Sequence, residues 1–170
     1  MSQQLTDTLA RRFFYGAPQD VLVIGCGLGK FARELSSLGH RVWACQESFA
    51  LTLQLQKWAD ERGNDADFFA ADPLHRQPFS DGFFDSVVIE EEIACTVDVN
   101  QLFIEACRMT RPGGTVVGTH MTHNVSPRRQ VRMFTAEQMY RFVTSFHWQA
   151  GAEILPAGFV FWIPVSGGSQ

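Results

Sequence analysis

The chain has 170 residues, a length typical of one globular domain, and 45% of them are hydrophobic against 19% charged. Its 14 basic and 18 acidic side chains give a net charge of −4, which argues against nucleic-acid binding through a basic face. No apolar run approaches the roughly 20 residues that a membrane-spanning helix needs. The four cysteines lack zinc-ligand spacing, and free thiols without a secretory signal predict a cytoplasmic protein.

Short apolar runs alternate with amphipathic segments along the chain. The runs that predict strands are 20–25, 41–45, 67–71, 84–89 and 115–119. The segments that predict helices are 6–14, 30–38, 48–62, 98–109 and 135–147. Short connections between such elements predict parallel strands joined by helical crossovers, and therefore a doubly wound α/β sandwich.

The carboxyl-terminal end of the pattern differs from the rest. Two strand-like runs, 152–155 and 159–165, are separated only by Pro156-Ala-Gly158, which is too short for a crossover. They are therefore predicted to pair antiparallel. We expect one domain over residues 1–170, with a helical segment within 1–16 and a frayed tail at 166–170.

The segment Gly25-Cys-Gly27-Leu-Gly29 lies between the first predicted strand and the following helix. Glycines there allow a sharp turn and a close ligand approach, beside the N–H groups of a helix N-terminus. The dinucleotide fingerprint G-x-G-x-x-G fails at Lys30, and its variant fits only in a frame shifted by two residues, ending at Ala32. The loop favours a ligand without pyrophosphate, such as an adenosyl amino acid. An NAD-dependent oxidoreductase remains an alternative.

Several motifs in order resemble the class I S-adenosylmethionine-dependent methyltransferases. They are Val21-Leu-Val-Ile-Gly-Cys-Gly-Leu-Gly29, Ala70-Ala-Asp72-Pro73, Gln77-Pro-Phe79, Gly82-Phe-Phe-Asp85 and Glu105-Ala-Cys-Arg108-Met-Thr-Arg-Pro112-Gly-Gly114. The resemblance implies a three-layer αβα sandwich around a seven-stranded sheet of order 3-2-1-4-5-7-6, with the seventh strand antiparallel. It also implies S-adenosylmethionine as the cofactor and methyl transfer to a small-molecule acceptor.

The resemblance also implies which residues contact the cofactor. They are the loop residues Gly25, Cys26, Gly27 and Gly29, the pair Asp72 and Pro73 beside the adenine amine, and the residue after the second strand that holds the ribose. The family has an acid at that last position, whereas this chain has Gln46, followed by Glu47. Glu47 can replace it only if the strand has already ended, because neighbouring strand side chains point to opposite faces.

A second departure from the family pattern is Val23, where an acid is common. Together with Gln46 it keeps open a methyltransferase-like binding or scaffold protein without turnover. Calorimetry with S-adenosylhomocysteine and with NAD distinguishes these possibilities.

Acidic and histidine side chains follow the fourth and fifth predicted strands. Glu90, nearest the strand end, is predicted to contact the cofactor, and Glu91 to orient an imidazole or receive a cationic acceptor. His120 is predicted to act as general base, with His123 nearby. A solvated acidic loop and a polar loop are the alternative interpretations. No third ligand accompanies the two histidines, so no metal site is predicted.

Two further groups are candidates for contacts around the ligand. Arg128, Arg129 and Arg132 could hold an anionic substrate through bidentate pairs, although a solvated basic loop is an equal alternative. The aromatic segment Phe13-Phe-Tyr15 is the candidate cover of the cofactor pocket.

Overall fold

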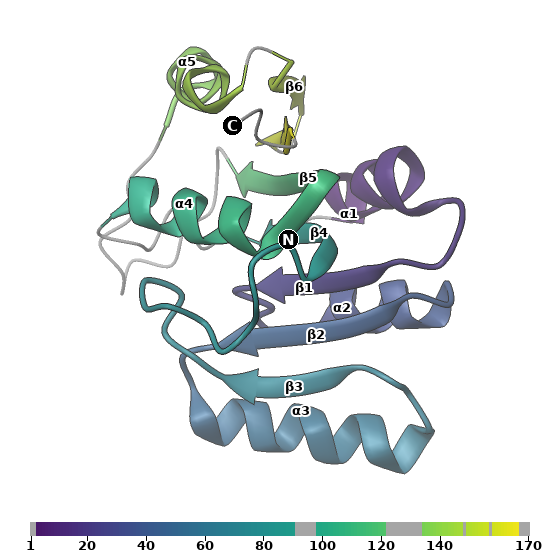
Figure 1. Cartoon of the computed structure of the whole chain (residues 1–170). Helices are drawn as coiled ribbons and strands as arrows, with labels where there is room; N and C mark the ends of the chain where they lie inside the picture. Colours follow the sequence, from purple (N-terminus) through teal and green to yellow (C-terminus); the bar gives the residue numbers. More distant parts are fainter. Residues whose placement is uncertain (1–2, 91–97, 122–133, 148, 157, 167–170) are drawn as a thin grey trace.

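The computed structural model describes residues 3–90, 98–121, 134–147, 149–156 and 158–166. Seven strands form one sheet in the order β3-β2-β1-β4-β5-β7-β6 (Figure 1). β7 runs antiparallel to both of its neighbours, β5 and β6, and the other neighbouring pairs are parallel. The strands are β1 (Asp20–Ile24), β2 (Arg41–Gln46), β3 (Asp67–Ala70), β4 (Phe84–Glu90), β5 (Thr110–Met121), β6 (Gly151–Leu155) and β7 (Gly158–Pro164). The predicted sheet order and the antiparallel hairpin are confirmed.

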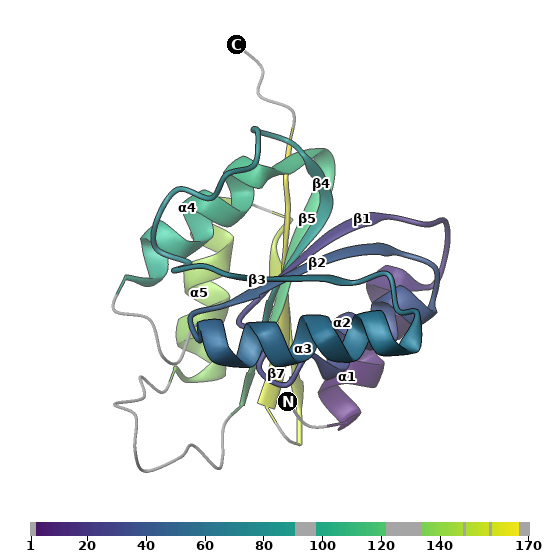
Figure 2. The same cartoon turned by 90° about the horizontal axis from the view of Figure 1, so that it is seen from below.

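Helices cover both faces of this sheet (Figure 2). On one face lie α1 (Gln3–Leu9), its π-helical continuation η1 (Ala10–Phe14), α2 (Lys30–Ser37) and α3 (Phe49–Arg62), while α4 (Val99–Met109) and α5 (Ala136–Phe146) lie on the other. Alternate residues of each strand face opposite layers. In β4, for example, Val88 packs with the α1–α3 layer, and Val87 and Ile89 pack with the α4–α5 layer.

Three helices begin at side-chain caps that were predicted from the sequence. The Ser48 hydroxyl accepts from Leu51 N–H, and the Asp98 carboxylate accepts from Gln101 N–H. Thr135 and Gln138 form a reciprocal capping box at the start of α5. The predicted caps of α3, α4 and α5 are therefore confirmed.

The largest differences from the predicted boundaries lie in the first helix and in β5. The first helix starts at Gln3 instead of Thr6, and its end widens into a π-helical turn. Strand β5 starts at Thr110, because a register irregularity opposite Phe84 and Ser86 brings the segment 111–114 into the strand instead of a preceding turn. It also extends to Met121, so His120 lies inside β5 instead of after it.

Among the described residues, no helix is long and apolar enough to cross a membrane. The described cysteines Cys26, Cys45 and Cys107 are free thiols.

Candidate functional site

A cavity of about 320 Å³ lies between the glycine loop and the carboxyl end of β4. Its lining residues come from four elements: Thr6 of α1, Gly25, Cys26, Gly27 and Leu28 of the loop, Lys30 of α2 and Glu90 of β4. The volume lies at the lower end of the range for small-molecule pockets. Four of the predicted cofactor residues, three in the loop and Glu90, are therefore brought together.

The shape of the glycine loop is set by its backbone. Gly25, Gly27 and Gly29 have φ values of 73°, 51° and 66°, a region that side chains rarely allow. The N–H groups of Gly25 and Cys26 donate to the Cys45 carbonyl at 2.9 and 3.1 Å, and Gly29 N–H donates to the Cys26 carbonyl at 2.7 Å. Because β1 ends at Ile24, the loop begins at Gly25. This placement favours the unshifted motif over the dinucleotide frame that starts at Gly27.

Gly29 fixes how closely the loop approaches β3. A Cβ atom at this position would lie 2.8 Å from the Phe68 ring and 3.3 Å from the Arg33 guanidinium. Gly27 has no atom within 4 Å of such a Cβ, so the open side of the loop lies at Gly27. The loop is therefore closely packed on one side and borders the cavity on the other.

Glu90 is a buried carboxylate in this wall, with 7% of the residue exposed. It follows Val88 on the face covered by α1, α2 and α3, and it pairs in register with Thr119 of β5. A carboxylate in that position favours a cationic group of a ligand bound beside the loop.

The first helix reaches the cavity through Thr6, a residue that was not predicted as a ligand contact. The predicted aromatic cover does not line it. Phe14 packs on Phe31 and His40, and Phe13 packs on Trp162. The amphipathic pattern at the N-terminus predicts the helix α1 itself. Which of its residues lines the cavity depends on how the helix crosses the sheet, and the pattern does not specify this.

Gln46 and Glu47 lie at the end of β2, the strand next to β1, which leads into the glycine loop. Neither residue lines the cavity. Strand β2 ends at Gln46, so Glu47 lies in the following bend and meets the condition for replacing Gln46. The Nε2 atom of Gln46 is buried and has no hydrogen-bond partner among the described residues. A buried donor without a partner is costly, so this atom favours a ligand oxygen at the site.

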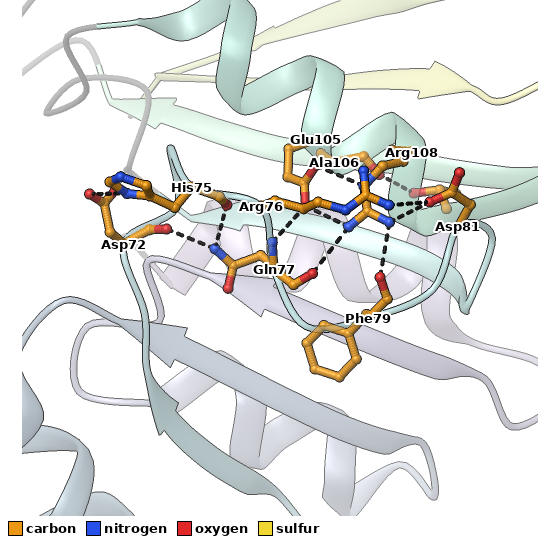
Figure 3. Close-up of polar contacts among 10 residues, drawn as sticks. Asp72, His75, Arg76, Gln77, Phe79, Asp81, Glu105, Ala106 and Arg108 are labelled. Carbon is orange, nitrogen blue, oxygen red and sulfur yellow. Dashed lines mark hydrogen bonds and ion pairs between the residues drawn. The ribbon is translucent and has the colours of Figure 1, made fainter.

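Asp72 lies after β3 in a turn that its own carboxylate stabilises (Figure 3). Leu74 N–H donates to Oδ1 at 2.9 Å, and Oδ2 pairs with His75 Nδ1 at 2.8 Å. The Leu74 hydrogen bond is the main cause that lowers the pKa of Asp72, with a further contribution from His75. Pro73 is buried beside it. Contact with an adenine amine stays a prediction for this pair, which does not line the cavity.

The loop that carries Asp72 is fastened to α4 by the ion pair of Glu105 and Arg108, two residues of the motif 105–114 (Figure 3). Glu105 Oε1 accepts from Gln77 N–H at 2.8 Å and from Arg108 Nη2 at 2.6 Å, while Oε2 accepts from Arg108 Nε at 2.8 Å. Arg108 Nη1 donates to the carbonyl of Phe79 at 2.9 Å and to Asp81 at 2.6 Å.

These contacts shift the two pKa values in opposite directions, and both shifts favour the charged form. The Arg108 hydrogen bonds lower the pKa of Glu105 despite its burial, and the Glu105 carboxylate raises the pKa of Arg108. Gln77 extends the network to the ligand edge, because its Nε2 donates to the carbonyls of Asp72 and His75 at 2.7 and 2.9 Å. The whole loop is thus held from α4.

His120 lies apart from the cavity. It is 1% exposed, and its ring packs on Phe159 and Phe134 at centroid distances of 5.1 and 5.9 Å, towards the α4–α5 layer. Phe134 N–H donates to His120 Nε2 at 3.3 Å, so in the neutral ring Nδ1 carries the proton. Glu90 faces the other side of the sheet.

The remaining predicted residues lie outside the described residues: Glu91, His123, Arg128, Arg129 and Arg132. Within the described ranges, no three His, Cys, Asp or Glu side chains are grouped as metal ligands.

The structure is a doubly wound α/β fold with a cavity at the carboxyl edge of its sheet, the edge where such folds bind ligands. Residues 22–118 match the family model described as methyltransferase domain. The match spans more than half of the chain, and the chain belongs to this family. Membership implies S-adenosylmethionine as the cofactor.

Curated relatives match over the same part of the chain. A malonyl-[acyl-carrier protein] O-methyltransferase of Buchnera aphidicola is 29% identical over 103 residues, covering 61% of this chain and 40% of that protein. A demethylmenaquinone methyltransferase of Paenarthrobacter aurescens is 32% identical over 109 residues, covering 64% and 41%. The matched region thus spans about two fifths of these relatives.

Solved structures share the fold at low identity. A Pyrococcus horikoshii protein has a TM-score of 0.80 and 17% identity, covering 95% of this chain and 88% of its own. A SAM-dependent methyltransferase of Methanosarcina mazei has a TM-score of 0.74 and 17% identity, covering 91% and 96%. The [4+2]-cyclase SpnF has a TM-score of 0.76 and 21% identity, covering 88% and 58%.

Proposed function

We propose that this domain transfers the methyl group of S-adenosylmethionine to a small-molecule acceptor. The observation that carries the proposal is the cavity of about 320 Å³ between the glycine loop and Glu90. Family membership supports methyl transfer, and the curated relatives are named for two acceptors, the small molecule demethylmenaquinone and the protein-bound malonyl-[acyl-carrier protein].

The residues around the cavity suit the parts of this cofactor. The glycines let a ligand approach the backbone, and the buried Glu90 carboxylate attracts a cationic amino group. The unpartnered Nε2 of Gln46 can donate to a ribose hydroxyl oxygen, with Glu47 as the alternative ribose ligand and Asp72 as the acceptor from the adenine amine. We assign these roles as part of the proposal.

When bound, S-adenosylmethionine supplies a methyl group whose bond to sulfur breaks as the acceptor atom bonds to it. The chain has to align the reactants and exclude water, which needs no covalent intermediate on a side chain. The glycine loop would hold the cofactor against its backbone atoms, and the buried Glu90 carboxylate would balance the positive charge of the cofactor.

Calorimetry tests the cofactor assignment. We expect S-adenosylhomocysteine to bind and NAD not to bind, because the motif starts at Gly25. Glu90→Gln keeps the shape of the side chain and removes its charge, and it should weaken binding by about tenfold, as for a lost charge-assisted hydrogen bond. Glu61→Gln, on an exposed ion pair of α3, is the matched control. Binding unaffected by Glu90→Gln would remove Glu90 from the site.

Methyl transfer needs its own measurement, because a [4+2]-cyclase shares this fold. The test is incubation with methyl-labelled S-adenosylmethionine and a panel of hydroxyl, thiol, amine and carbon-acid acceptors. Label transferred to an acceptor supports the enzyme. Binding of the cofactor with no acceptor labelled would instead support a binding or scaffold protein.

The acid–base roles of His120 and Glu91 stay in the proposal and have a specific test. To accept a proton at Nε2, His120 must first lose the hydrogen bond from Phe134 N–H. His120→Gln can keep an acceptor for that N–H but does not titrate. A general base predicts a roughly 10²-fold lower turnover with S-adenosylhomocysteine affinity unchanged. Full turnover would assign His120 to packing, and Glu91→Gln is measured in parallel.

A further inference from the structure

We propose that Arg33 is a positioning residue that holds the glycine loop in its ligand-binding shape. The inference rests on the proposed cofactor site, since the loop is one wall of that cavity. Arg33 itself does not line the cavity, and neither the motif nor the family match assigns it a role.

Arg33 bonds the loop directly. Its Nη1 donates to the carbonyl of Leu28 at 2.5 Å, and its backbone N–H donates to the carbonyl of Gly29 at 3.0 Å. Leu28 lines the cavity and is 72% exposed, so its own side chain gives it little anchorage. It lies between Gly27 and Gly29, both with positive φ, where the backbone has many alternative conformations. The guanidinium of Arg33 therefore fixes Leu28, the exposed residue between two flexible glycines.

Arg33 is in turn held by α3. Its guanidinium carbon lies 4.3 Å from the ring centroid of Trp58, within cation–π range. A planar guanidinium can stack on a ring and donate in its own plane at the same time, whereas an ammonium cannot combine the two in this way. The stacking on Trp58 thus restricts the rotamers of Arg33 while Nη1 reaches Leu28. The glycine loop is coupled through one side chain to the third helix.

The chain contains a natural control for this arrangement. The guanidinium of Arg62 also lies over Trp58, at 4.7 Å from the ring centroid. Arg62 is the last residue of α3, and within the described part of the chain it has no hydrogen bond to the glycine loop. Arg33 and Arg62 therefore share the ring contact and the charge, and they differ in the bond to Leu28.

A loop with three glycines loses much conformational freedom when it binds a ligand in one shape. Contacts that order the loop beforehand reduce that loss and raise affinity without touching the ligand. Phe68 restricts the loop at Gly29. Arg33 restricts it at Leu28, and the two together leave Gly27 as the open edge.

The experiment compares Arg33→Met with Arg62→Met. Each substitution removes one positive charge and keeps an unbranched stem. By calorimetry we expect Arg33→Met to weaken S-adenosylhomocysteine binding by about tenfold, the factor that corresponds to one charge-assisted hydrogen bond. Arg62→Met should change it less than about twofold. Arg33→Lys, which keeps a donor but not the stacked plane, should lie between them. Equal affinities of the two Met variants would overturn the proposal.

Amide hydrogen exchange in the loop reports local ordering separately from the overall stability of the protein. In the absence of ligand, amides 25–30 should exchange about tenfold faster in Arg33→Met than in Arg62→Met, while amides of β1 exchange alike in both. Unchanged loop exchange would overturn the proposal. If the wild-type protein binds no S-adenosylhomocysteine, the proposed function fails, and the exchange data still decide whether Arg33 orders the loop.

Discussion

Two loops meet at the end of β2, and they are held in opposite ways. The glycine loop takes most of its shape from backbone atoms, with two N–H groups on the Cys45 carbonyl, and Arg33 adds one side-chain hydrogen bond at Leu28. The loop after β3 starts from the next carbonyl, that of Gln46, which accepts from Ala71 N–H at 3.0 Å. Beyond that point it is held by side chains of α4, chiefly Glu105 and Arg108.

The difference matters for what each loop can do. A loop shaped by backbone hydrogen bonds and glycines can leave an open wall for a ligand, and a cavity lies beside it. A loop held by a buried ion pair depends on charge, so it is sensitive to truncation and to acid. Substitutions and pH should therefore affect the two loops differently.

The largest expected effect is on the side-chain-held loop. Arg108→Met leaves the Glu105 carboxylate, 5% exposed, without its main partner, and should lower the free energy of unfolding by about 3–5 kcal/mol. Arg76→Met is the control, because its ion pair with Asp81 is 70% exposed on both sides and should contribute less than about 1 kcal/mol. Denaturant unfolding measures both. Similar losses in the two variants would mean that Arg108 does not hold the loop.

The second effect concerns the backbone-shaped loop. Gly29→Ala combines a positive φ with a contact of 2.8 Å to Phe68, and should lower the free energy of unfolding by about 2–4 kcal/mol. Gly63→Ala has a similar φ of 61° but no atom within 4 Å, so about 1 kcal/mol is expected. The same unfolding measurement applies. If both cost the same, the close approach to Phe68 does not constrain the loop.

Much of the fold was predictable because its signals are local. The alternation of apolar runs and capped helices sets the crossovers, and the residues that cap α3, α4 and α5 are the predicted ones. The start of β5 was not predictable, because Arg111 to Gly114 has turn chemistry and lies in the register irregularity between the pairs Phe84–Thr110 and Ser86–Thr115. Gly114 is needed there, since a Cβ would clash with the Asp85 carbonyl.

The parts of the site that depend on where strands end were predictable. The parts that depend on which face of the sheet a side chain lies on were less so. The glycines follow the end of β1 and Glu90 is the last residue of β4, and the carboxyl ends of these strands share one edge of the sheet. His120 was expected near the same mouth, but strand alternation places it with Phe159 on the α4–α5 side. The contact between Arg33 and Leu28 depends on a rotamer that no spacing encodes.

A third, smaller effect is the response to acid. The pKa of Glu105 is lowered in the folded state, so its stabilising contribution is present above the ordinary value of 4.5 and is lost as pH falls below it. The slope from one group is at most about 1.4 kcal/mol per pH unit. Glu105→Gln should remove this part of the pH dependence. The free energy of unfolding of the wild type and of Glu105→Gln is measured from about pH 6 to about pH 3. The same pH dependence in both proteins would contradict the assignment.

The smallest effect tests the residue between the two loops. Gln46 gives its backbone carbonyl to the second loop and lies beside the first, and its buried Nε2 lacks a partner among the described residues. If Gln46 meets the ribose, Gln46→Asp should tighten S-adenosylhomocysteine binding by about 1 kcal/mol, because a carboxylate accepts from hydroxyl groups with charge assistance. Gln46→Ala should weaken it.

Glu47→Gln is the matched variant for this last test, since Glu47 lies in the bend directly after the strand. A loss of affinity in Glu47→Gln, with no change in either Gln46 variant, would place the ribose on Glu47 instead. Calorimetry with S-adenosylhomocysteine measures all three variants under one set of conditions. No effect in any of them would remove the nucleoside from the end of β2, and would leave the glycine loop and Glu90 as the ligand contacts at this edge of the sheet.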